Sequence, residues 1–278
     1  MIAAPFSRET LLNVVKTLPA APQILAQLGR LLLDINSDLN DITLLLKRDA
    51  ALTARIIRIS NSAIYNTGLP FASLEEALAR VGYTEVYRLT GFAAVAQLAD
   101  QHLPLYGMSG VQLRENALFT ALMVELTART AGLDEREAYT AGLLRSIGKI
   151  AIDRIAKGSG LAFEAGGLEG IAAWETTQVG QSNVEAAATI LGEWRFPSDT
   201  IVAIRDHYAD EANDFALAQL LNLAAGAADR RGHGLPGEQG YWTLTPARLA
   251  AAGLDRKQFD AAEQLALEKF QALRAAVS

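Results

Sequence analysis

The sequence predicts an all-α protein, and three observations favour that fold class. Apolar residues recur at the spacing of one helix face along most of the chain. We find no run of alternating apolar and polar residues bounded by hairpin turns, so strands are not expected. Helix start signals are also frequent, because a hydroxyl or acidic residue precedes many of the periodic segments.

A first group of helices is separated by short turns that are polar or contain Gly or Pro. Within it, Ser73 and Glu76 fit a capping box, in which a hydroxyl and a carboxylate each accept a hydrogen bond from an otherwise unpaired backbone N–H. Asn61 follows an apolar run and is interpreted as a C-cap or turn residue. The helices predicted for this group are 7–17, 22–34, 39–47, 50–61, 73–81 and 84–99.

The segment 100–112 contains Pro and Gly and separates this group from a second one. In the second group, Ser182 and Glu185 form another capping box. Five glycines between residues 156 and 170 predict a mobile loop. The helices predicted for this group are 113–131, 136–156, 183–194, 198–209 and 216–231.

A C-terminal extension follows the second group. Thr245 before Pro246 is a helix start, since proline is tolerated at the first helical position. Asp255 is expected to cap a last amphipathic helix, whose apolar side carries Phe259, Ala262, Ala266, Phe270 and Leu273. The chain is accordingly divided into two packed helical subdomains and a helical extension, at residues 1–105, 110–231 and 241–278.

The composition excludes several classes of function. The 278 residues are 50% hydrophobic, enough for a sizeable core, and carry a net charge of −6 with scattered Lys and Arg, so we expect no nucleic-acid partner. With no cysteine and three histidines, the chain has few strong ligands for a transition metal. No signal-peptide pattern is found, and the longest uncharged stretch, 215–228, is shorter than the ~20 residues that span a membrane. We therefore expect a cytoplasmic protein that binds neither a membrane nor a cofactor.

Six segments, taken in order, resemble one known family. They are "LPAAPQIL" (18–25), "LLLKRDAALTARIIRISNSAIY" (44–65), "SLEEALARVGYTEVYRL" (73–89), "AYTAGLLRSIGKIAI" (138–152), "VGQSNVEAAATILGEWRFP" (179–197) and "IVAIRDHY" (201–208). Their order and spacing resemble the HDOD family, an output domain related to the HD phosphohydrolases, over about residues 10–231. The resemblance implies that the second subdomain is a degenerate HD-type helical core. It also implies a bacterial signalling or regulatory module rather than an enzyme.

The resemblance also implies that a metal site has been lost. Enzymes of the HD superfamily hold a divalent metal with histidines and aspartates from several helices, and the metal turns a bound water into a nucleophile. The residues that align with these ligands are Asn116 (or Glu115, if the register shifts by one), Arg145, Ser146, Asn183 and His207. Arginine has no lone pair to donate and would repel a metal beside it. We therefore expect no metal and no enzymatic activity.

Arg145 and Lys149 lie four residues apart on one face of a predicted helix, where like charges cost about 0.2–0.5 kcal/mol. The interpretation that we favour is a solvated face near a helix C-terminus, where cations are stabilised. The other is a pocket that accepts an anion, such as a nucleotide phosphate or a carboxylate of a partner. His207 is interpreted as a satisfied, half-buried histidine. The candidate residues for an anion site are Asn116, Arg145, Ser146, Lys149, Asn183 and His207.

These observations favour a non-catalytic regulatory module that binds a partner protein of unknown identity. One alternative is a degenerate phosphohydrolase scaffold that serves as a sensor of a nucleotide or another anion. A second alternative is a metal-dependent phosphodiesterase with an unusual ligand set. Metal content, nucleotide-induced stabilisation and partner capture distinguish the three hypotheses.

Overall fold

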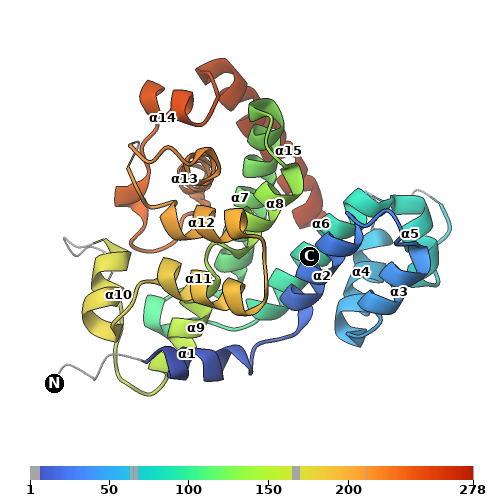
Figure 1. The fold of residues 1–278 in the computed structure, drawn as a ribbon, viewed down its shortest axis with the longest axis horizontal. Helices are drawn as coiled ribbons and strands as arrows, with labels where there is room; N and C mark the ends of the chain where they lie inside the picture. The colour runs from blue at the N-terminus through green and yellow to red at the C-terminus, as the bar shows by residue number, and fades with distance from the viewer. Residues whose placement is uncertain (1–6, 63–64, 66–67, 165–169, 211, 278) are drawn as a thin grey trace. The chain divides into compact units, whose positions relative to one another are not determined.

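The computed structural model describes residues 7–62, 65, 68–164, 170–210 and 212–277. These residues form helices joined by turns and loops, and the strand-like pairing among them is one isolated bridge between Leu103 and Met108 (Figure 1). The all-α fold class is therefore confirmed. No helix in the described part of the chain is both long and apolar enough to cross a membrane.

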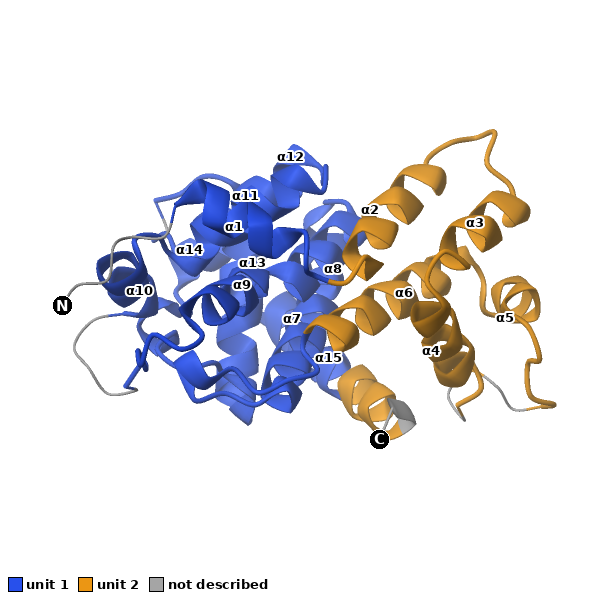
Figure 2. Ribbon diagram, turned by 90° about the horizontal axis from the view of Figure 1, so that it is seen from below, with its two compact units in different colours: residues 1–18, 99–267 blue, residues 19–98, 268–278 orange. Residues whose placement is uncertain are grey.

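The chain divides into two compact units, which are described separately (Figure 2). Unit 2 comprises residues 19–98 and 268–278, and α6 packs in it against both α2 and α4. The leucines at positions 25, 28 and 46 are fully buried, since each helix turns its apolar stripe inward. Its helices are α2 (Ala21–Leu31), α3 (Leu39–Leu46), α4 (Ala50–Ser60), α5 (Leu74–Val81) and α6 (Tyr83–Leu98).

Unit 1 comprises residues 1–18 and 99–267. Its longest internal helix, α7, is apolar or small on nearly all sides and packs against both α8 and α13, as expected for a buried central helix. The elements of this unit are α1 (Arg8–Val15), η1 (Pro104–Tyr106), α7 (Gly110–Ala131), α8 (Glu135–Leu144), α9 (Ile147–Ala156), α10 (Ile171–Val179), α11 (Asn183–Glu193), α12 (Ser198–Asp206), α13 (Ala216–Ala228), η2 (Asp229–His233), η3 (Gln239–Tyr241), α14 (Pro246–Ala251) and most of α15 (Arg256–Val277).

The predicted helix starts are confirmed, but one of the two predicted capping boxes is only half formed. Ser182 and Glu185 form a complete capping box. Ser73 caps α5, but the Glu76 carboxylate accepts from Ala72 N rather than from Ser73 N. Thr245 caps α14, and Asp255 caps α15 by accepting from Gln258 N at 2.7 Å. Asn61 ends α4, and its amide both donates to and accepts from the backbone of Phe71. Local side-chain chemistry thus decides where these helices begin and end.

Three features depart from the sequence predictions. The single helix expected over 136–156 is two helices, because the chain turns at Arg145 and Ser146. Helix α10 lies in a segment for which no helix was expected, just after a Gly-rich stretch whose residues 165–169 lie outside the described part. Helix α1, expected with the N-terminal subdomain, packs against α9 and α11 within unit 1.

Helices α9 and α11 approach each other closely at Gly148. A Cβ atom at this position would overlap the carbonyl oxygen of Asn183 and lie 2.9 Å from Ala187 N. The contact is with backbone atoms, which cannot rotate away as a side chain does. Gly148 is therefore required for the packing that places Lys149 and Asn183 next to each other.

We expect Gly148→Ala to lower the free energy of unfolding by about 1–3 kcal/mol or more, because the added methyl group forces the two helices apart. Gly192 is a matched control, since it also lies in a helix of unit 1 but has nothing within 4 Å of its Cβ position. Gly192→Ala should be neutral or stabilise by up to about 1 kcal/mol. Urea denaturation followed by circular dichroism measures both values. Equal effects of the two substitutions would contradict the close approach.

Candidate functional site: a buried ion cluster

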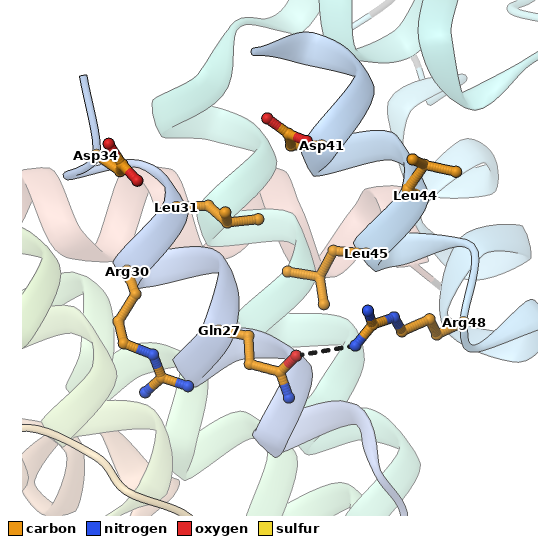
Figure 3. Close-up of a pocket in the computed structure, with 8 residues that line it drawn as sticks. All are labelled: Gln27, Arg30, Leu31, Asp34, Asp41, Leu44, Leu45 and Arg48. Atoms are coloured by element: carbon orange, nitrogen blue, oxygen red, sulfur yellow. Dashed lines mark hydrogen bonds between the residues drawn. The ribbon is translucent and has the colours of Figure 1, made fainter. Parts of the chain in front are cut away.

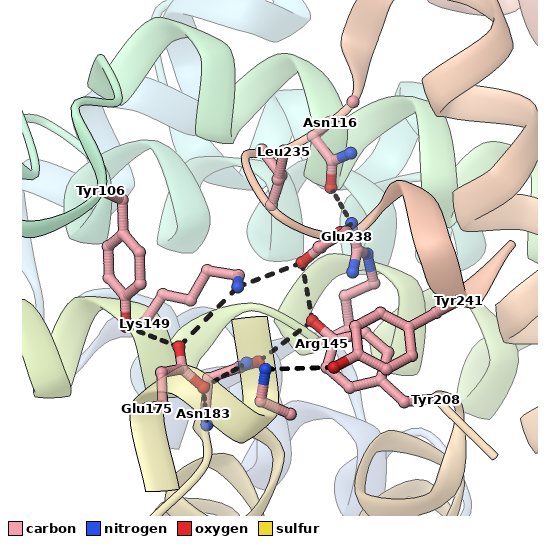
Figure 4. Close-up of polar contacts among 12 residues, drawn as sticks. Tyr106, Asn116, Arg145, Lys149, Glu175, Asn183, Tyr208, Leu235, Glu238 and Tyr241 are labelled. Atoms are coloured by element: carbon pink, nitrogen blue, oxygen red, sulfur yellow. Dashed lines mark hydrogen bonds and ion pairs between the residues drawn. The ribbon is translucent and has the colours of Figure 1, made fainter. Parts of the chain in front are cut away.

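Polar side chains from several elements of unit 1 meet in one buried cluster (Figure 4). We call it the buried cluster. Its members come from η1, α7, the α8–α9 junction, α9, α10, α11, the end of α12 and the loop around residue 238. The members are Tyr106, Asn116, Arg145, Lys149, Glu175, Asn183, His207, Tyr208 and Glu238, of which Tyr208 is half-buried and the others are buried.

Arg145 contacts three other members of the buried cluster. It ends α8, and its Nη2 donates to Glu238 Oε2 at 2.9 Å and to Asn116 Oδ1 at 2.7 Å. Its Nη1 lies 3.3 Å from His207 Nε2, and the guanidinium carbon stands 5.5 Å from the Trp242 ring centroid. The planar fork therefore makes a charge-assisted hydrogen bond to one carboxylate and holds two neutral groups in place.

Lys149 lies one turn further along and joins the two carboxylates of the cluster. Its Nζ is 3.3 Å from Glu238 Oε1 and 3.9 Å from Glu175 Oε1. It also stands 5.1 Å from the Tyr106 ring centroid, within the range of a cation–π contact. Because Lys149 lies between Glu175 and Glu238, it links their two halves of the cluster.

Glu175 is held by donors at the start of α11. Its Oε2 accepts from Asn183 N at 2.5 Å and from Asn183 Nδ2 at 2.7 Å, and its Oε1 accepts from the Tyr106 hydroxyl at 2.8 Å. Burial raises the pKa of Glu175 above its usual value, although Lys149 and these hydrogen bonds oppose the shift. A carboxylate at a helix N-terminus is a favourable arrangement, because the first backbone N–H groups have no partner inside the helix.

Glu238 is placed by a loop that is tightly fitted to its surroundings. Its Oε1 accepts from the Tyr208 hydroxyl at 2.8 Å. Gly237 precedes it at φ +75°, its carbonyl accepts from Ile171 N at 3.1 Å, and a Cβ there would lie 2.5 Å from the Phe163 ring. Burial acts to raise the pKa of Glu238, but Arg145 and Lys149 hold it at about 2. The carboxylate is therefore ionised at neutral pH.

His207 is buried and neutral. Its Nδ1 lies 2.7 Å from Ile204 O, so this nitrogen carries the proton and Nε2 accepts from Arg145. Burial lowers the pKa of His207 to about 3, and the charge of Arg145 lowers it in the same direction. Its only free lone pair is thus directed at a guanidinium and not at a metal.

The buried cluster is balanced in charge. Arg145 and Lys149 supply two positive charges, and Glu175 and Glu238 supply two negative charges. A divalent ion placed here would lie beside a guanidinium and an ammonium, while both carboxylates already bind those cations. Among the described residues, no group of three or more His, Asp and Glu is arranged to hold a metal. The residues present therefore do not fit the metal of the HD superfamily.

Five of the six candidate residues lie together in the buried cluster. Asn116, and not Glu115, faces the cluster, since Glu115 instead lies 3.2 Å from His233 Nδ1. Ser146 is buried, but its hydroxyl has no hydrogen-bond partner in the described part of the chain. His207 is satisfied as expected, although it is fully rather than half-buried.

One interpretation of the sequence is wrong. A solvated face was favoured for Arg145 and Lys149, yet their exposed fractions are 1% and 0%. Two cations can be buried here because carboxylates from distant parts of the chain neutralise them. The anion that these cations hold is therefore Glu238 of the protein itself.

Sequence reasoning missed both carboxylates. Glu175 lies on α10, which was not predicted, and Glu238 lies in the loop "GHGLPGEQG", which carries no catalytic or metal-binding pattern. The one available signal was indirect: cations at positions aligned with buried ligands require buried counter-charges. That requirement does not say which of the many acidic residues meets it.

We expect Arg145→Met to destabilise the protein by about 3–5 kcal/mol, because it leaves a buried carboxylate short of a partner. Glu238→Gln should also destabilise the protein, because it leaves two buried cations with one carboxylate. The double variant keeps one cation, Lys149, and one carboxylate, Glu175. Its loss in free energy of unfolding should therefore be smaller than the sum of the two single losses by about 0.5–3 kcal/mol. Urea denaturation of the four proteins measures this coupling. The exposed pair Arg256–Asp260 is the control, with an expected coupling of at most about 0.5 kcal/mol. Additive losses for the Arg145 and Glu238 substitutions would contradict the predicted coupling between these two charges.

The buried His207 predicts loss of stability in mild acid. Its pKa is lowered from 6.5 to about 3, so between these pH values the unfolded chain binds a proton that the folded protein does not. The free energy of unfolding should then fall by up to about 1.4 kcal/mol per pH unit as pH decreases below 6.5. His207→Gln should flatten this slope whatever its effect at neutral pH. Urea denaturation at several pH values between 6.5 and 3 measures the slope, and an unchanged slope in His207→Gln would contradict the prediction.

Solved structures share this fold. An HDOD domain protein of unknown function from Geobacter sulfurreducens is 19% identical, with a TM-score of 0.67 over 96% of this chain and 97% of that one. A proposed phosphohydrolase from Shewanella amazonensis is 21% identical, with a TM-score of 0.64 over 97% of this chain and 98% of that one. A proposed signal transduction protein from Marinobacter aquaeolei is 19% identical, with a TM-score of 0.68 over 97% of this chain and 64% of that one.

No curated protein matches the sequence. At the identities of the solved structures, the likeness establishes the fold alone. The family is established by the sequence, because the sequence model of the HDOD domain family matches residues 18–210, which is more than half of the chain. This protein therefore belongs to the HDOD family.

Proposed function

We propose that the chain is a non-catalytic regulatory module of bacterial signal transduction, located in the cytoplasm, that acts by binding a partner protein. The observation that carries the proposal is the Arg145–Glu238 ion pair. Arg145 stands at a sequence position that aligns with a metal ligand of the HD superfamily, and Lys149 and His207 are bound within the same network. An internal ion pair at this place leaves no ligand set to activate a water.

The names of the structural relatives point to two different functions. The Shewanella protein is a proposed phosphohydrolase, and the Marinobacter protein is a proposed signal transduction protein. The buried cluster supports the second kind of function for this chain. Phosphoester hydrolysis needs an activated nucleophile, but both carboxylates here bind cations, His207 is bonded to Arg145, and the Ser146 hydroxyl has no base among the described residues to activate it.

A sensor of a nucleotide or another anion is the second candidate. Arg145 and Lys149 favour it, since a guanidinium and an ammonium are common phosphate ligands. An external anion would have to displace Glu238, whose ionised carboxylate binds both cations. Stabilisation by phosphate or nucleotides that appears only in Glu238→Gln would mean that the native site is closed to them, whereas stabilisation of the unaltered protein that is lost in Arg145→Met would favour the sensor.

We expect the purified protein to carry no stoichiometric Mn, Fe, Ni or Zn, and to hydrolyse neither cyclic dinucleotides nor other phosphodiesters. The reason is that Arg145 repels a cation, that Asn116, Ser146 and Asn183 offer only weak neutral oxygens, and that the His207 lone pair faces Arg145. Elemental analysis and a hydrolysis assay with added metal check this. About one metal or more per chain, removed by a chelator together with an activity, would contradict the proposal.

Binding requires a positive test. The tagged full chain, incubated with an extract of the native organism, should capture a specific protein that the tag alone does not. Mass spectrometry then identifies the partner, and the purified pair should form a complex with a measurable Kd. Failure of every captured protein to bind directly would leave the proposed function without support.

A further inference from the structure

Helices α2 and α3 of unit 2 enclose a groove of 410 Å³ (Figure 3). The groove residues on each side are spaced at i, i+3, i+4 and i+7, and the first three of each set lie on one face of α2 or α3. Asp34 and Arg48 follow just beyond the ends of these helices. One wall is formed by Gln27, Arg30, Leu31 and Asp34, and the other by Asp41, Leu44, Leu45 and Arg48. This spacing is typical of a face that packs against another helix.

The middle of the groove is apolar, and its apolar surface continues outside it. Leu31 and Leu45 lie between the polar ends in Figure 3, and Leu44 on the rim is 58% exposed. Leu33 and Ile35, which flank the lining residue Asp34 in sequence, are 70% and 96% exposed. Exposed apolar side chains gathered around a groove mark a surface for a macromolecule rather than for a ligand confined to the groove.

The charges of the groove are ordered along its length. Asp34 and Asp41 lie at one end, and Arg30 and Arg48 lie toward the other (Figure 3). Asp34 Oδ1 accepts from Asn36 N at 2.9 Å, and Asp41 Oδ2 accepts from Asp38 N at 3.1 Å, so both aspartates are held in position. Arg48 Nη1 donates to Gln27 Oε1 at 3.2 Å across the groove. The two ends therefore present fixed charges of opposite sign.

We propose that this groove is the docking site for an amphipathic α-helix of the partner protein. The helix would place an apolar stripe over Leu31 and the exposed Leu44, with the buried Leu45 forming the floor beneath them. It would place an acidic residue beside Arg30 and Arg48 and a basic residue beside Asp34 and Asp41. Charge complementarity selects this occupant, since the reversed helix would meet like charges at both ends. The proposal rests on the proposed function, because it names the surface through which partner binding occurs.

The test uses the full chain and a displayed library of amphipathic helical peptides that share a leucine stripe and have randomised charge at both ends. We expect selection of peptides that are acidic at one end and basic at the other. The Kd of the best peptide, measured by fluorescence anisotropy, should rise by about tenfold or more in Leu44→Gln. Leu69→Gln is the matched control, because Leu69 is an exposed leucine of the same unit that does not line the groove.

Arg48→Glu provides the second arm. When the library is selected for binding to Arg48→Glu, the chosen peptides should carry a basic residue in place of the acidic one at the end that lies beside position 48. The other end of the peptide should be unchanged. Leu44 and Arg48 are both exposed, and circular dichroism verifies that the variants remain folded. Peptides that bind every variant equally, or no selected peptide at all, would overturn the proposal. A concentration-dependent dimer of this chain that Leu44→Gln abolishes would overturn it in favour of a second copy as the occupant.

The partner from the native extract separates this proposal from the proposed function. Capture by the unaltered chain but not by Leu44→Gln supports both. Capture by both proteins keeps the proposed function and overturns the groove as its site. Peptide binding in the groove without any captured partner keeps the groove as a helix-binding surface and argues against the proposed function.

Discussion

The buried ion pair between Arg145 and Glu238 is the interaction on which the candidate site depends. A guanidinium taken out of water costs several kcal/mol unless a carboxylate and further hydrogen bonds compensate. Glu238 supplies the carboxylate, while Asn116 and His207 supply the hydrogen-bond acceptors. Because these partners come from α7, α12 and the loop around residue 238, Arg145 can be buried only when all three are in place.

This constraint determines what lies at the centre of unit 1. The α8–α9 junction directs the Arg145 side chain into the helical core, where a carboxylate of the same protein neutralises its charge. Its counter-charge, Glu238, lies beyond the residues 18–210 that the HDOD model matches. Such a cluster contributes little net stability compared with apolar packing, but its hydrogen bonds are satisfied only in one arrangement of the surrounding helices.

Much of the helical organisation could be predicted from the sequence, because its causes are local. Helix ends follow from side chains a few residues away, as at Ser182 and Asp255, and buried faces follow from apolar spacing, as at Phe259 and Phe270. The inability of Arg145 to bind a metal was also predictable, since it depends on the chemistry of one side chain. These properties need no knowledge of which segments lie side by side.

The tertiary structure decided where the charges go. Exposure of Arg145 and Lys149 depended on carboxylates 93 and 26 residues away in the sequence, and no local pattern distinguishes Glu238 or Glu175 from a surface glutamate. The turn at residues 145 and 146 likewise could not be predicted, because neither position carries a helix-breaking Pro or Gly. Composition and periodicity determine which helices form, but the energy of a buried charge depends on distances of a few ångströms between segments that only folding brings together.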